Sequence, residues 1–174
     1  MWDKVTLQDE KIIDRWSILI GNAQGQAEKT YSETENLIRL SKAPGIEIER
    51  VKVRPSWLKG LFGVERNYMM VTNEGLKDYR MFIGARDYGD NLDVSWYLTC
   101  EPGFFKKTLS NVLTSGASDK ALSFTLDIFQ QQDLNAYATL VHHCLRETLE
   151  KIITDLGQDP NKMDYKSKGF LGIS

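Results

Sequence analysis

Hydrophobic residues recur at three-, four- and seven-residue spacings in two segments, one near each end of the chain. Such spacings place side chains on one face of a helix, so both segments are predicted to be long amphipathic helices. The apolar series of the first segment is Ile12, Trp16, Ile20, Ala23, Ala27, Tyr31 and Ile38. This helix is expected to end at residues 42–45, where proline and glycine oppose its continuation. The second is predicted from about Asp133 to Leu156, with Gly157 as its stop.

Between the two helices, apolar and polar residues alternate, as is typical of strands with one buried face. Strands are predicted at residues 46–48 continuing through 51–53, at 68–72, 79–85 and 92–100, and at 122–128. In the first of these, the apolar phase slips at Glu49 and Arg50, which a β-bulge would produce. Residues 87–91 contain the aspartates, glycine and asparagine of a hairpin loop.

The order of these elements predicts a single α+β domain over residues 1–174. We expect an antiparallel sheet of about five strands with the two long amphipathic helices, N-terminal and C-terminal, packed on one face. In the strand at 92–100, Trp96 is predicted to face the core, while Ser95 and Tyr97 face the other side. Residues 158–174 form a C-terminal tail that is either docked on the domain or mobile.

The composition, 41% hydrophobic and 26% charged with a net charge of −2, predicts a soluble globular chain. No apolar run approaches the ~20 residues of a membrane span, and the N-terminus lacks the apolar stretch of a secretory signal. We therefore expect a cytoplasmic location. Two cysteines are too few for a disulfide framework. Nucleic acid is not expected as a partner, because a basic excess is confined to residues 42–68.

Two groups of residues are weak candidates for a metal site. His143 and Glu147 are four residues apart and adjacent on a helix surface, and Asp87, Asp90 and Asp93 surround the predicted hairpin. A metal-dependent enzyme using both groups is one alternative. A solvated helix face and local turn chemistry explain the same residues more simply, so we expect no cofactor and no catalytic residue.

Three segments outside the predicted strands combine lysine with bulky apolar residues, at 57–62, 103–107 and 166–171. The residues singled out as a partner-binding set are Trp57, Lys59, Phe62, Phe104, Phe105, Lys106 and Phe170. Exposed aromatic anchors with a charged rim are typical of protein interfaces, which favours a non-enzymatic domain that binds a protein partner or its own copy. A membrane surface is an alternative ligand. Single-stranded nucleic acid is a further alternative, with Arg54, Lys59 and Arg66 on phosphates and Trp57, Phe62 and Tyr68 stacked on bases. The last alternative is that these aromatics fold inward and cover the sheet.

Overall fold

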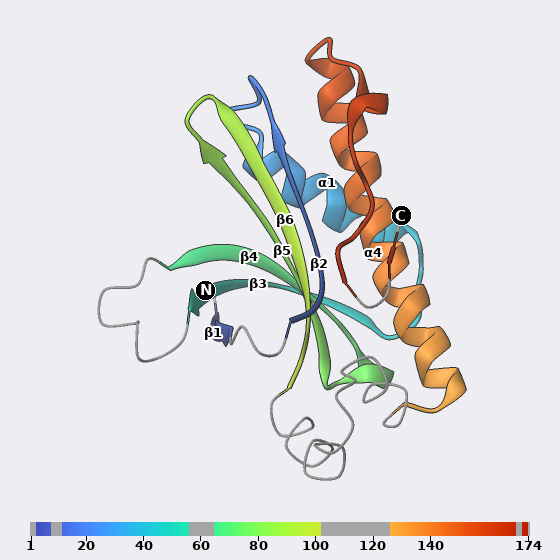
Figure 1. The fold of residues 1–174 in the computed structure, drawn as a ribbon. Helices are drawn as coiled ribbons and strands as arrows, with labels where there is room; N and C mark the ends of the chain where they lie inside the picture. Colours follow the sequence, from blue (N-terminus) through green and yellow to red (C-terminus); the bar gives the residue numbers. More distant parts are fainter. Residues whose placement is uncertain (1–2, 8–11, 56–64, 102–125, 170–171, 174) are drawn as a thin grey trace.

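The computed structural model describes residues 3–7, 12–55, 65–101, 126–169 and 172–173 (Figure 1). The strands are β1 (Asp3–Leu7), β2 (Ile12–Ile20), β3 (Ile46–Pro55), β4 (Arg66–Asn73), β5 (Tyr79–Tyr88) and β6 (Asn91–Cys100). The helices are α1 (Ala27–Leu40) and α4 (Ile128–Asp155), with short 3₁₀ turns η3 (Glu74–Leu76) and η4 (Pro160–Lys162). The predicted partner-binding residues of the aromatic-basic segments all lie outside the described residues.

The strands form one twisted sheet in the order β1-β3-β4-β5-β6-β2. Neighbouring strands are antiparallel except β1 and β3, which are parallel. Helices α1 and α4 lie together on one face of this sheet, and the opposite face carries no helix of the described chain (Figure 1). The predicted α+β class, with an antiparallel sheet and two helices on one face, is confirmed. In the described residues the sheet has one parallel strand, β1, that the sequence pattern did not predict.

The N-terminal helix begins later than its spacing predicted, because residues 12–20 form strand β2. A four-residue spacing such as that of Trp16 and Ile20 fits a helix face, but it also fits one face of a strand, since four is a multiple of two. The burial pattern decides between them: Trp16 is buried between the exposed Arg15 and Ser17. The chain then turns through Asn22 and Gly25, both at positive φ, before α1 starts at Ala27.

The predicted bulge in β3 is wrong, because the register between β3 and β4 is continuous from Ile46 to Val53. The phase slip has another cause. Ile46 and Ile48 pack against the main core beneath the helices, whereas Val51 and Val53 join a second cluster with Tyr68 and Phe82. The strand therefore buries opposite faces along its length, and each face of the sheet has an apolar cluster of its own.

Helix α4 starts earlier than predicted and takes up the end of the segment predicted as a fifth strand. Asp127 is the N-cap, and it exchanges hydrogen bonds with Gln130 in a capping box. Ile128, the last residue of the predicted strand, and Phe129 are exposed residues of the first turn, so the apolar side chain of Ile128 marks no sheet face. Residues 122–125 of the predicted strand lie outside the described part of the chain.

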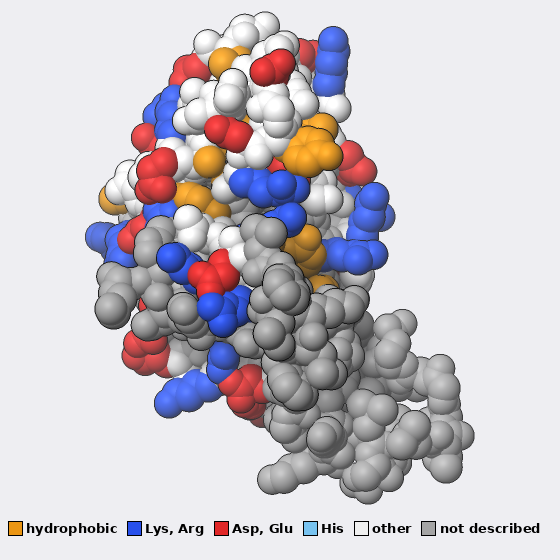
Figure 2. Space-filling view, turned by 90° about the vertical axis from the view of Figure 1, so that its left-hand side faces the viewer, with side chains coloured by type: hydrophobic (Ala, Val, Ile, Leu, Met, Phe, Trp, Pro, Cys, Tyr) orange, Lys and Arg blue, Asp and Glu red, His pale blue; other side chains and the backbone are white. Residues whose placement is uncertain are grey.

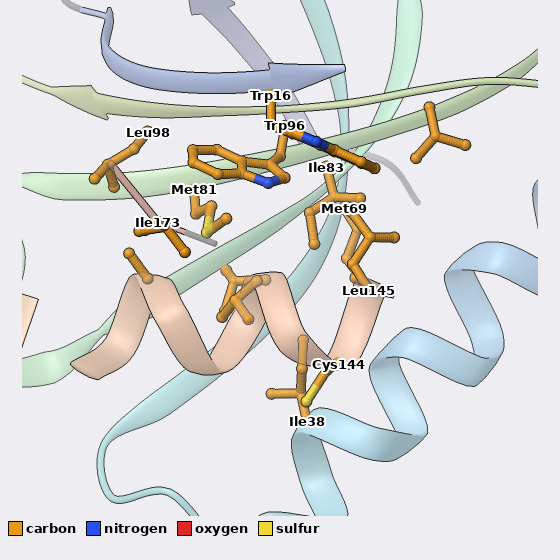
Figure 3. Close-up of a cluster of buried hydrophobic side chains, with 14 of the residues drawn as sticks. Trp16, Ile38, Met69, Met81, Ile83, Trp96, Leu98, Cys144, Leu145 and Ile173 are labelled. Atoms are coloured by element: carbon orange, nitrogen blue, oxygen red, sulfur yellow. The ribbon is translucent and has the colours of Figure 1, made fainter. Parts of the chain in front are cut away.

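The main core lies between the sheet and the helices, where Trp16, Met81 and Trp96 of the sheet approach Leu145 of α4 (Figure 3). Full burial of such large side chains is the main source of stability in a domain of this size. The indole nitrogen of Trp96 donates a 2.9 Å hydrogen bond to Nδ1 of His142, which is itself fully buried. Burial lowers the pKa of His142 to about 4, so the imidazole is neutral at physiological pH.

The tail after α4 is docked along edge strand β2. The indole nitrogen of Trp16 donates to the carbonyl oxygen of Asp164 at 2.9 Å, and the ring of Tyr165 stacks on Trp16. The backbone nitrogen of Lys168 donates to the carbonyl oxygen of Arg15 at 2.8 Å. These contacts cover backbone groups that an edge strand otherwise leaves open to pairing with another chain.

No helix in the described ranges is long and apolar enough to cross a membrane.

Candidate binding surface on the open face of the sheet

The face of the sheet opposite the helices, called the open face below, contains a split between β4 and β5. The two strands pair only over residues 69–72 and 80–83, although both continue beyond that point. Past the pairing, β3 and β4 bend away from β5, β6 and β2 (Figure 1). Diverging strands leave backbone groups without their ladder partners, and these groups need other hydrogen bonds.

A single buried hydroxyl from α1 supplies hydrogen bonds at the split. The Tyr31 hydroxyl accepts from the backbone nitrogen of Ala85 at 2.8 Å, and it lies 2.9 Å from the carbonyl oxygen of Asn67 and 3.1 Å from that of Ala85. Its one proton is shared between these two carbonyls. Burial raises the pKa of Tyr31 to about 12, so the hydroxyl keeps that proton at any physiological pH.

On the open face, the ring of Tyr68 lies directly against the backbone of Gly84. A Cβ built on Gly84 would be 2.6 Å from Cε1 of Tyr68, which is closer than any normal carbon–carbon contact. Gly84 is therefore required for this position of the ring. Tyr97 is next to it, with ring centroids 6.4 Å apart and the planes tilted by 57°.

These two tyrosines line a solvent-open hollow of about 490 Å³ that spans the split. Its lining residues are Ser17, Glu65, Arg66, Asn67, Tyr68, Gly84, Ala85, Arg86, Asp93, Ser95 and Tyr97. Figure 2 shows the molecule from the side away from α4, with basic side chains at the centre of the view beside hydrophobic ones. A hollow of this volume is within the range of sites that hold a ligand or part of a partner.

The charges around the hollow are unevenly compensated. Asp93 forms an ion pair with Arg86 at 2.8 Å, and Glu65 forms one with Arg54. Arg66, which lines the hollow, makes no ion pair with any residue in the described part of the chain. The same holds for Arg15, whose register partner in the sheet is Tyr97. The side chains of Arg66 and Arg15 are both exposed. Within the described residues, the carboxylates of Asp93 and Glu65 are therefore paired, whereas these two guanidinium groups are available to a ligand.

Burial raises the pKa of Tyr68, with the neighbouring Tyr97 adding to the effect and Arg66 opposing it. The phenol is therefore neutral at physiological pH. A neutral hydroxyl both donates and accepts, and Ser17 and Ser95 offer the same capacity on either side. The surface combines flat aromatic area, adaptable hydroxyls and two available cations, with no nucleophile–base pair among its lining residues.

Of the candidate metal residues, only Asp93 lines the hollow, and the other four are at other places in the fold. His143 and Glu147 are exposed on α4, and Asp87 and Asp90 are exposed at the β5–β6 hairpin. The Asp87 carboxylate accepts from the backbone nitrogen of Gly25 at 2.9 Å, which is ordinary loop chemistry, and Asp93 is paired with Arg86. Within the described ranges, no three histidine, cysteine, aspartate or glutamate side chains form a group that could hold a metal ion.

Of the three aromatic-basic segments, only part of the third is described. Ser167 is buried, and its hydroxyl accepts from the backbone nitrogen of Ile173 at 2.8 Å. Lys166 and Lys168 are exposed on either side of it. The tail thus holds two lysines beside strand β2, next to Arg15.

The alternation along β6 predicts that Tyr97 and Ser95 lie on the outer face of the sheet, but no sequence pattern predicts the hollow. The hollow depends on the split between β4 and β5 and on Gly84, which the sequence pattern presents as one more residue of a strand. The phase change between Ile48 and Val51 was the available signal, since it indicates that the second face also has an apolar cluster.

No protein-family model, curated protein or solved structure matches this chain.

Proposed function

We propose that this chain is a non-enzymatic interaction domain that binds a protein partner through the open face of its sheet. The observation that carries the proposal is the hollow at the β4–β5 split, where Tyr68 and Tyr97 lie between the available arginines Arg15 and Arg66. Tyrosine and arginine are enriched at protein interfaces and supply most of the residues whose truncation costs binding energy.

The chemistry of the hollow supports binding rather than catalysis. Tyrosine offers a large rigid contact area at low entropic cost, and serine and asparagine offer adaptable hydrogen bonds, a combination typical of surfaces that bind proteins. Ser17, Ser95 and Asn67 provide the second kind of contact around the two rings. An open hollow of about 490 Å³ suits a protruding part of a partner's surface.

The aromatic-basic segments are part of the proposed surface. Glu65, which lines the hollow, directly follows residues 56–64 in the chain, so the proposal assigns Trp57, Lys59 and Phe62 to the same contact. Phe104, Phe105, Lys106 and Phe170 are proposed as further contacts. A cytoplasmic location is also proposed, because a chain with only two cysteines does not have the disulfide framework of small secreted domains.

Site-specific photo-crosslinking tests the proposal in the cell that makes the protein. A benzophenone amino acid replaces Ser17, which is exposed and lines the hollow, in one variant, and the exposed Leu156 after α4 in a control. We expect a discrete protein adduct from position 17 and none from position 156. An adduct with a second copy of the chain would identify self-association as the form of binding. Absence of any protein adduct at position 17 would contradict the proposal.

A further inference from the structure

We infer that the partner presents an acidic, extended segment to the open face, and that its carboxylates pair with Arg66 and Arg15. This inference rests on the proposed function and names the chemistry of the partner. It commits to a segment of a different protein, not to a second copy of this chain and not to a membrane surface.

The first step is the charge balance of the surface. The carboxylates closest to the hollow, Glu65 and Asp93, already pair with Arg54 and Arg86. Arg66 and Arg15 have no such partner among the residues that the structure describes. Complementary charge steers association and fixes the register of a bound segment, whereas an approaching basic group would meet two cations that have no ion pair within the described ranges. The surface therefore selects for acidic residues.

The second step is the distance between the two arginines. Arg66 is on β4 and Arg15 is on β2, with β5 and β6 between them. Three strand spacings correspond to about 14 Å across the sheet. The register places Arg15 level with Met70, so an offset of four residues along β4 and the split between β4 and β5 both add to this. One carboxylate or phosphate cannot reach both guanidinium groups across such a span. An extended peptide rises about 3.3 Å per residue, so a short segment with two acidic residues reaches both.

The third step concerns what lies between the arginines. The rings of Tyr68 and Tyr97, with the backbone of Gly84 beneath Tyr68, form the floor of the hollow. A side chain held between two aromatic rings gains most when it is itself aromatic or bulky and apolar. The expected segment thus has acidic residues on either side of an aromatic or large aliphatic one.

Selection from a displayed library of random peptides tests this inference. The selected peptides are resynthesised, and their dissociation constants are measured by fluorescence anisotropy against four proteins. These are the wild type, Arg66→Glu, Arg15→Glu and the control Lys162→Glu, which changes an exposed lysine on η4 by the same charge. We expect enrichment of aspartate and glutamate, and about a tenfold rise in Kd for each arginine variant, with no change for the control.

The failure of this inference is distinguishable from failure of the proposed function. If the selected peptides are neutral or basic and lose binding with Tyr97→Ala but not with either arginine variant, the acidic partner is wrong and the binding face stands. If no peptide is selected, or if binding is indifferent to all open-face substitutions, both are wrong.

Two further measurements test the other occupants. Sedimentation of the wild type at increasing concentration would reveal a dimer, and loss of that dimer in Arg66→Glu would show that a second copy covers the face. Co-sedimentation with phosphatidylserine vesicles, abolished by the same substitution, would assign the arginines to a membrane surface. Either result would overturn the inference, and a monomer that ignores the vesicles supports it.

Discussion

The two faces of the sheet differ in what covers them, although they are made by alternating residues of the same strands. On the helix-covered face, Trp96 and Leu98 are fully buried beneath α4. On the open face, Ser95 and Tyr97 from the same strand line a hollow of about 490 Å³. One face forms the main core of the fold, whereas we propose that the other face binds a partner. Neighbouring positions of β6 therefore separate stability from binding, and substitutions there can test each role alone.

The largest expected effect compares residues 96 and 97. Trp96→Ala removes a fully buried indole and leaves the Nδ1 atom of His142 without its donor, so it is expected to lower the free energy of unfolding by about 3–5 kcal/mol. Tyr97→Ala, on a half-buried side chain of the open face, is expected to lower the free energy of unfolding by only about 1 kcal/mol. It is also expected to abolish binding of the selected peptides. Urea unfolding measures the free energy of unfolding of both variants, and equal losses of this free energy would contradict the division between the faces.

Acid is expected to destabilise the helix-covered face through His142. Its pKa is about 4 when folded and 6.5 in the unfolded chain, so between these values the unfolded state binds a proton that the folded state excludes. Stability is therefore unaffected by this group above pH 6.5 and falls as the pH decreases to 4, by about 3 kcal/mol in total.

The comparison of two histidine variants checks this effect. His142→Asn keeps an acceptor for the Trp96 indole but cannot titrate, so its unfolding free energy should depend less on pH than that of the wild type. His143→Asn, which removes the neighbouring exposed imidazole, should keep most of the wild-type dependence, because burial lowers the pKa of His142 more than His143 does. Parallel curves for His142→Asn and the wild type would show that the buried imidazole does not control acid stability.

Removing one hydroxyl is expected to weaken the split from which the hollow is built. Tyr31→Phe keeps the buried ring but deprives Ala85 and Asn67 of the hydroxyl that bonds their backbone groups, at a cost of about 2 kcal/mol. Tyr88→Phe is the matched control, because its ring is 60% exposed and its hydroxyl has access to water. Thermal unfolding compares the two variants, and an equal melting temperature would contradict the bridging role of Tyr31.

The smallest effect on stability is expected on the open face itself. Arg66→Glu changes an exposed side chain that has no ion pair in the described part of the chain, so it should alter the unfolding free energy by less than about 0.5 kcal/mol. Its effect should appear in binding alone. A loss of stability comparable to that of Tyr31→Phe would mean that Arg66 supports the fold.

The sequence predicts much of the helix-covered face and little of the open one. Alternation in β4, β5 and β6 marks their core-facing residues because burial of one face imposes a period of two. It fails at β2, where the spacing of Trp16 and Ile20 fits helix and strand alike. It also fails at Gly84, because the need for glycine there arises from Tyr68 on another strand. The hollow is a product of tertiary geometry, and no local pattern encodes it.

The central claim is that a partner binds to the open face and not to the helical layer. The most direct test is the amide NMR spectrum of the labelled protein with and without a selected acidic peptide. The account predicts the largest shift changes at Asn67, Ser95 and Tyr97, with little change along α4. Changes concentrated on α1 and α4, with the open face unaffected, would contradict it.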